Sequence, residues 1–166
     1  MRTFVTACLC AFAWMAGPGF AGAPNDFAAR ILTAHNDERT ALQLPPLAWS
    51  DTLAAAAAEW ANRLVEVGRP EHSPKSVRPG IGENLWAGTA GAFTPEEMVQ
   101  GWAAEKEFYH YGPFALPTDG HVVGHYTQMI WKNTTEVGCA TAKMGTWDVL
   151  VCRYAPEGNL LGEKPY

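Results

Sequence analysis

A glutamate within the apolar face of a predicted helix is the clearest sign of chemistry in this sequence. The segment TPEE at residues 94–97 has the form of a capping box with proline at the first helical position, which predicts a helix from residue 95 to about 109. A buried carboxylate is costly unless it is paired or coordinated, so Glu105 is predicted to have a partner, at a functional site or in an ion pair of the core. Spacings of four, three and four residues define the inner stripe of this helix: Met98, Trp102, Glu105 and Tyr109.

Histidines are the other groups that could bind a metal or transfer protons. No pair of them has the spacing of a zincin motif, so a site would need ligands that converge from distant segments. His35 lies beside Asn36 and Arg39 in a predicted helix, where we expect all three to form a hydrogen-bonded anchor. His110 and His121 are expected at the surface. The five histidines are His35, His72, His110, His121 and His125.

Covalent nucleophilic catalysis is poorly supported. The sequence contains three serines, Ser50, Ser73 and Ser76, and no G-x-S-x-G elbow. The segment GIGE at residues 80–83 lacks the strand-to-helix context of a dinucleotide-binding loop. We therefore predict no catalytic residue.

Helix signals dominate the first half of the chain. Asp26 is a suitable N-cap for a helix over residues 27–43, which must end before Pro45-Pro46. Ser50 caps a second helix, rich in alanine, that ends at Gly68.

Strands and loops dominate the rest. Residues 83–87 are predicted to form a short strand, residues 124–131 a compact segment, and the alternating runs 136–143 and 146–154 an antiparallel hairpin joined through Met144-Gly145. Early helices and late strands predict an α+β fold, with helices covering both faces of a small antiparallel sheet.

The first 21 residues read as a secretory signal peptide. Arg2 precedes an apolar run from Phe4 to Ala16, which a Gly-Pro-Gly break ends too soon for a membrane span. A membrane anchor is the rival interpretation. Cleavage after Ala21 would leave a single domain over residues 22–166 and place it outside the cytoplasm, in an extracellular or periplasmic compartment.

Two cysteines, Cys139 and Cys152, remain after such cleavage, because Cys8 and Cys10 belong to the leader. An even number in an oxidising compartment predicts that they form a disulfide, which would connect the two strands of the hairpin. Two buried free thiols are the alternative.

Charge argues against nucleic acid as a partner. Lysine and arginine total 12 against 17 aspartates and glutamates, giving a net charge of -5, and no basic block interrupts the sequence. Nucleic-acid binding needs a cationic surface that neutralises phosphates. The 48% apolar content suits one compact domain.

Four motifs in order resemble the CAP superfamily, which comprises the cysteine-rich secretory, antigen 5 and plant pathogenesis-related proteins. The most specific is GHYTQMIW at residues 124–131. The others are His35-Asn36 with Arg39, GENL at residues 82–85, and CRYAPEGN at residues 152–159. Together they cover nearly the whole chain after the leader.

The resemblance implies a three-layer α-β-α sandwich with a cleft lined by His72, Glu83, Glu105 and His125. Two imidazoles and two carboxylates suit a divalent cation such as Zn²⁺, with the histidines binding and the glutamates orienting them. Structural readings also stand: His72 as a solvated turn residue, His125 as a satisfied core histidine, and Glu83 paired with neighbouring backbone.

The resemblance further implies a secreted module that binds a sterol, a fatty acid or another lipid. Four aromatic residues are candidates for an apolar groove: Phe108, Tyr109, Tyr111 and Phe114. A metal-dependent hydrolase is one alternative, and a defence or signalling ligand of an extracellular receptor is another. This chain has fewer cysteines than plant members usually carry, so the loop before Gly124 is expected to lack a disulfide.

Overall fold

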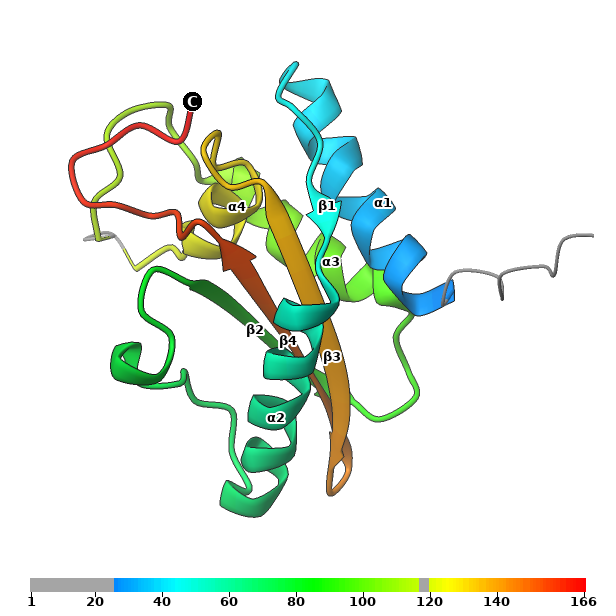
Figure 1. The fold of residues 1–166 in the computed structure, drawn as a ribbon. Coiled ribbons are helices and arrows are strands. Elements are labelled where there is room, and N and C mark those ends of the chain that lie inside the picture. Colours follow the sequence, from blue (N-terminus) through cyan, green and yellow to red (C-terminus); the bar gives the residue numbers. More distant parts are fainter. Residues whose placement is uncertain (1–25, 117–119) are drawn as a thin grey trace, which may run out of the picture.

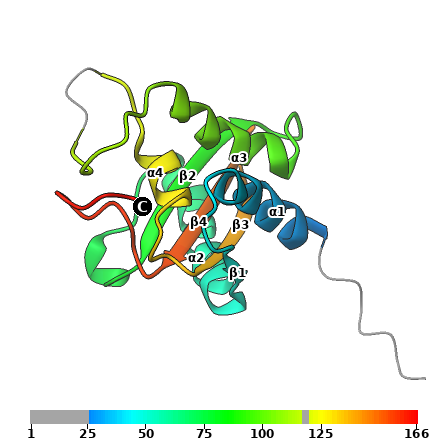
Figure 2. The ribbon, with the colours of Figure 1, turned by 90° about the horizontal axis from the view of Figure 1, so that it is seen from above.

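The computed structural model describes residues 26–116 and 120–166, which form three layers with a sheet between helices (Figures 1 and 2). The helical elements are α1 (Asp26–Ala41), α2 (Asp51–Val67), the 3₁₀ turn η1 (Lys75–Val77), α3 (Pro95–Ala103), the 3₁₀ turn η2 (Ala104–Glu107) and α4 (Gly124–Met129). The strands are β1 (Ala48–Trp49), β2 (Gly82–Thr89), β3 (Glu136–Met144) and β4 (Trp147–Ala155).

Local signals set the helix ends. The Ser50 side chain accepts a hydrogen bond from the Leu53 amide at the start of α2, and Gly68 ends that helix with a φ of 75°, a left-handed conformation that favours glycine. The capping box predicted at the start of α3 is present. However, α3 ends at Ala103 and continues as η2 only to Glu107, so the helix predicted to reach residue 109 is shorter and Glu105 lies in the tighter turn.

The sheet has the strand order β1-β3-β4-β2. The predicted hairpin is confirmed, since β3 and β4 are antiparallel with Cys139 opposite Cys152. On the other side of β4, β2 pairs antiparallel with it. The sheet is nevertheless mixed rather than wholly antiparallel, because β1 runs parallel to β3. This strand was not predicted, as two residues carry no alternating pattern.

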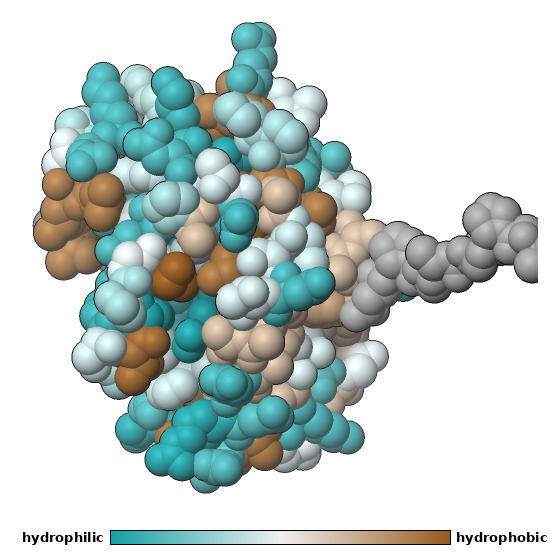
Figure 3. Space-filling model, viewed as in Figure 1, coloured by the Kyte–Doolittle hydropathy of each residue, from teal (hydrophilic) through white to brown (hydrophobic). Residues whose placement is uncertain are grey.

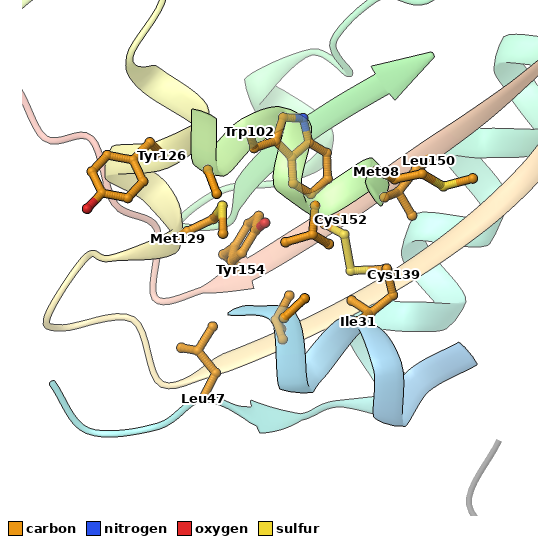
Figure 4. Packing of buried hydrophobic residues seen from close by; sticks show 14 of the residues in the cluster. Ile31, Leu47, Met98, Trp102, Tyr126, Met129, Cys139, Leu150, Cys152 and Tyr154 are labelled. Carbon is orange, nitrogen blue, oxygen red and sulfur yellow. A yellow bond between two sulfur atoms is a disulfide. The ribbon is translucent and has the colours of Figure 1, made fainter. Parts of the chain in front are cut away.

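Each face of the sheet has its own core, which confirms the layered arrangement. On one face α2 packs against the sheet through a cluster that includes Ala57, Ala61, Leu64, Val149 and Val151. On the other face α1, α3 and α4 cover a larger core, shown in Figure 4, that includes Ile31, Met98, Trp102, Met129, Leu150 and Tyr154.

Close packing of α2 on β3 depends on Gly138. A Cβ at this position would lie 2.3 Å from the Ala54 nitrogen and 2.4 Å from the Ser50 oxygen. Both atoms belong to the backbone and cannot move aside, so glycine allows α2 to begin directly on the strand.

The predicted disulfide is confirmed. Cys139 and Cys152 are joined across β3 and β4, with exposed fractions of 3% and 0%. Closing a loop of this length is expected to stabilise the fold by about 3 kcal/mol through its effect on the unfolded chain. The bond therefore connects the two central strands within the larger core.

The leader predicted over residues 1–21, with Cys8 and Cys10, lies outside the described residues. Within residues 26–116 and 120–166, no helix has the length and apolar character needed to cross a membrane.

Candidate functional site

Glu105 and His125 form a pair between η2 and α4. The His125 Nδ1–H donates to Glu105 Oε1 at 2.5 Å, while the backbone amides of His125 and Tyr126 donate to Glu105 Oε2 at 3.0 and 3.1 Å. The Glu105 side chain is 14% exposed. The carboxylate thus holds both the ring of His125 and the backbone at the start of α4. His125 is therefore the partner that a carboxylate in the apolar stripe was predicted to have.

The His125 ring is fixed on a second side by Trp102 of α3. The two rings are stacked, with centroids 6.0 Å apart and planes 18° from parallel. The Trp102 indole N–H donates to the Leu85 carbonyl of β2 at 3.0 Å, so the indole itself is held in place. His125 is therefore more than a satisfied core histidine, because its side chain is oriented yet 26% exposed.

His72 and Glu83 form a second pair, between the loop after α2 and the edge strand β2. The His72 Nδ1–H donates to Glu83 Oε1 at 2.9 Å, although the His72 side chain is 51% exposed and that of Glu83 is fully buried. Ser73 completes the set, with its amide 2.9 Å from Oε1 and its hydroxyl 2.6 Å from Oε2. The Ser73 hydroxyl is consequently committed to a carboxylate and is not presented as a nucleophile.

Two arginines surround the Glu83 carboxylate. Arg78 Nε lies 3.7 Å and an Arg153 terminal nitrogen 3.6 Å from its oxygens. Burial by itself raises the pKa of Glu83, but the hydrogen bonds from His72 and Ser73 and the charge of Arg78 outweigh it and bring the pKa below its usual value. Glu83 is therefore ionised at neutral pH despite its burial.

The four predicted residues thus lie as two histidine–glutamate pairs. In both pairs the glutamate accepts a hydrogen bond from Nδ1–H, which leaves the unprotonated Nε2 as the nitrogen that can bind a ligand. The pairs are connected through β2, because Glu83 is followed by Asn84, whose Nδ2–H donates to the His125 carbonyl at 3.0 Å. Among the described residues, no three histidine, cysteine or acidic side chains gather closely enough to hold an ion by themselves.

The donor types, two imidazoles each held by a carboxylate, are those expected in the predicted cation site. Neutral imidazole with its second nitrogen held by a carboxylate is the usual arrangement of a histidine ligand. The remaining positions around an ion would be filled by water or by a bound molecule.

One hollow includes the His72–Glu83 pair in its lining, and a second is lined by residues on either side of His125 in the sequence. One, with a volume of about 460 Å³, is lined by His72 and Glu83 together with Lys75 and Gln128. The other, of about 220 Å³, is the aromatic groove, lined by Phe108, Tyr109, His110, Phe114, His121, Val123 and Thr127 among others.

Three of the four aromatic residues predicted for the groove are confirmed in it, and Tyr111 is not. Its ring packs on Tyr166 with centroids 5.0 Å apart, and its hydroxyl donates to the Tyr166 carbonyl at 2.5 Å. Contact with the C-terminal residue therefore directs Tyr111 away from the groove. His110 and His121 are exposed as predicted.

His35, Asn36 and Arg39 form the predicted structural anchor. Asn36 exchanges two hydrogen bonds with the backbone of Leu47, at 2.8 and 3.1 Å. The Arg39 guanidinium donates to four carbonyls, those of Pro45, Met129, Trp131 and Thr134. These contacts attach α1 to the loop before β1, to the end of α4 and to the segment that follows α4.

Sequence reasoning missed the groups that hold Glu83. Arg153 lies directly opposite Glu83 in the β2–β4 register, so the pairing of these strands would have identified it. Ser73 directly follows the predicted site residue His72 and carries two donors, its amide and its hydroxyl. This position in the sequence could have identified it as a partner of Glu83. Arg78 lies in a loop, and nothing in the sequence places it.

Comparisons with known proteins agree with this geometry. The cysteine-rich secretory protein (CAP) family model matches residues 32–154. Pathogenesis-related protein PR-1 of Medicago truncatula is 38% identical over 144 residues, which are 84% of this chain and 79% of that protein. Among solved structures, NaASP2 with Zn²⁺ has a TM-score of 0.77 at 22% identity and covers 90% of each chain.

Na-ASP-1 is similar to 97% of this chain at a TM-score of 0.76 and 24% identity, and the match spans 46% of the length of Na-ASP-1. Likenesses at this level of identity establish the fold, while the family model and the plant relative establish descent. The chain belongs to the cysteine-rich secretory protein (CAP) family and is of the pathogenesis-related type.

Proposed function

We propose that this protein is a secreted binding module in which His72 and His125 hold a divalent cation such as Zn²⁺ through Nε2. The observation that carries the proposal is that both imidazoles donate Nδ1–H to a glutamate, at 2.9 and 2.5 Å, and so present the other nitrogen. Glu83 and Glu105 fix ring orientation and favour a positive charge nearby. A bound cation would supply a Lewis-acidic centre for a polar group of a ligand.

The structure of NaASP2, which has a similar fold, was solved with Zn²⁺, and this supports the choice of ion. Zinc accepts imidazole nitrogen readily and tolerates sites that leave coordination positions to water. Binding requires neutral imidazole and is therefore expected to weaken as the pH falls.

A metal titration tests this proposal. Adding Zn²⁺ to metal-free protein is expected to raise the melting temperature with the logarithm of free zinc, equivalent to about 2.7 kcal/mol at a hundredfold excess over Kd. His72→Ala and His125→Ala each remove one of two protein ligands, and we expect zinc affinity to fall at least about a hundredfold in each.

His110→Ala is the matched control, because His110 is exposed and has no glutamate partner among the described contacts. It should bind zinc like the wild type. A melting temperature insensitive to zinc in folded wild-type protein, or equal zinc affinity in all three variants, would reject the site.

We further propose that the aromatic groove takes the acyl chain of a fatty acid. Val123 and Thr127, which line the groove, lie two residues before and two residues after His125 in the sequence. A ligand in the groove and a cation on His125 would therefore both contact the region of α4. A volume of about 220 Å³ is below that of pockets that enclose a whole drug-sized molecule, which favours a narrow chain over a sterol ring system. On the face shown in Figure 3, the most hydrophobic residues occur in small separate groups.

Two phenylalanines of equal exposure test the groove. Phe108 lines it and is 42% exposed, whereas Phe93 is 43% exposed and packs on Trp86 elsewhere. Fluorescent fatty-acid titration should show affinity about tenfold lower in Phe108→Ala, because part of the buried apolar contact is lost. Phe93→Ala should match the wild type, and equal affinity in the two variants would place the ligand elsewhere.

A further inference from the structure

A chain of buried hydrogen bonds connects α1 to the backbone of His125. His35 Nδ1 lies 2.8 Å from the Ile31 carbonyl, and its Nε2 lies 2.8 Å from the Tyr154 hydroxyl. That hydroxyl lies 3.1 Å from Asn84 Nδ2, which also lies 3.0 Å from the His125 carbonyl. His35, Asn84 and Tyr154 are 0%, 2% and 0% exposed.

The direction of every bond in this chain is fixed. The Ile31 carbonyl can only accept, so His35 carries its proton on Nδ1, and burial lowers the pKa of His35 to about 4, which keeps the ring neutral at pH 7. Nε2 must then accept from the Tyr154 hydroxyl, whose oxygen accepts one Asn84 N–H. The second Asn84 N–H donates to the His125 carbonyl, since that oxygen too can only accept.

The start of α4 is consequently held from two directions. Glu105 accepts from the amides of His125 and Tyr126 and from the His125 ring, while Asn84 donates to the carbonyl of the peptide that joins these two residues. Asn84 belongs to the edge strand β2, and Tyr154 belongs to the neighbouring central strand β4, two residues beyond Cys152, so both supports come from the sheet. Because α4 has only six residues, it has little rigidity of its own.

We infer that Asn84, Tyr154 and His35 are positioning residues that hold the His125 peptide so that its ring and amide meet Glu105. None of them contacts the imidazole ring through a hydrogen bond, and none is a proposed ligand. Their value for ion binding rests on the proposed function, whereas their effect on the His125 peptide does not.

Amide hydrogen exchange separates positioning from general stability. In Asn84→Ala the His125 carbonyl loses its side-chain donor, and we expect protection at the His125 and Tyr126 amides to fall at least about tenfold more than at the Val151 amide, which reports unfolding of the sheet. Asn36→Ala is the matched control, since Asn36 also bonds backbone through its side-chain amide, but at Leu47 and not at α4. It should lower protection at all three amides alike.

Tyr154→Phe keeps the ring and removes only the hydroxyl, so it serves if Asn84→Ala does not fold. It should reduce protection at His125 and Tyr126 selectively but less than Asn84→Ala does, because Asn84 retains its bond to His125. Uniform loss of protection in both variants, as in Asn36→Ala, would overturn the inference.

Zinc affinity provides the second measurement. Loss of a group that orients a metal ligand typically weakens metal binding 10- to 100-fold. Asn84 acts one contact further away, through the His125 peptide, so we expect about a tenfold decrease for Asn84→Ala and less than about twofold for Asn36→Ala. Equal zinc affinity in the two variants would overturn the positioning role. Failure of the wild type to bind zinc would count against the proposed function, while the exchange result would still decide this inference.

Discussion

Replacing Arg39 by methionine is expected to lower the free energy of unfolding by about 4 kcal/mol. The Arg39 side chain donates to four carbonyls at 2.7–3.1 Å and is fully buried. Burial lowers its pKa to about 10, so the guanidinium remains charged at neutral pH. Methionine fills similar volume but offers no donor, so four carbonyls each lose a buried hydrogen bond, one after α1, one at the end of α4 and two in the segment that follows α4.

Urea denaturation measures this loss. Arg63→Met is the control, because Arg63 has a 58% exposed side chain and its ion pair with Glu66 lies at the surface. That change should alter the free energy of unfolding by no more than about 0.5 kcal/mol. Similar losses in the two variants would show that the buried guanidinium does not anchor α1.

Acidification between pH 6.5 and 4 is expected to cost about 3 kcal/mol of stability through His35 alone. Burial lowers the pKa of this imidazole from 6.5 to about 4, because the charged ring would lose its hydration in the core. The unfolded chain therefore binds a proton in this range that the folded protein does not. The stabilisation is complete above pH 6.5 and is lost as the pH falls toward 4.

Denaturation at several pH values, with His35→Gln as the comparison, isolates this effect. Glutamine does not titrate, so its profile should be flatter by the same amount. Glu83 affects stability at lower pH than His35 does. Its pKa is below the usual value in the folded protein, so its contribution to stability is lost only as the pH falls below about 4.5. Parallel profiles for wild type and His35→Gln between pH 6.5 and 4 would contradict the buried neutral imidazole.

The sequence was most informative where local chemistry decides structure. Ser50, Gly68 and the capping box at Thr94 fix helix ends through bonds between near neighbours, and all three were predicted. The hairpin followed from alternation, and the disulfide followed from an even number of cysteines in a chain predicted to enter an oxidising compartment. By contrast, β1 exists only through its pairing with β3, and the change from α3 to η2 accompanies the bonds of Glu105 to α4, so neither leaves a local signal.

Candidate site residues were predictable for a similar reason. Glu105 could be identified because a carboxylate in an apolar stripe demands a partner, but its partner His125 lies 20 residues away and came from a family resemblance. Arg78 and Arg153 surround Glu83 through tertiary contacts alone. Tyr111 was assigned to the groove because aromatic composition cannot show that its ring packs on Tyr166 instead.

A crystal structure of the wild-type protein with Zn²⁺, with anomalous data collected at the zinc edge, shows whether His72 and His125 bind one ion. We expect one anomalous peak about 2.0–2.1 Å from Nε2 of both histidines, with both Nδ1 atoms still hydrogen-bonded to Glu83 and Glu105. A peak on one imidazole only, coordination through Nδ1, or no peak at saturating zinc would contradict it.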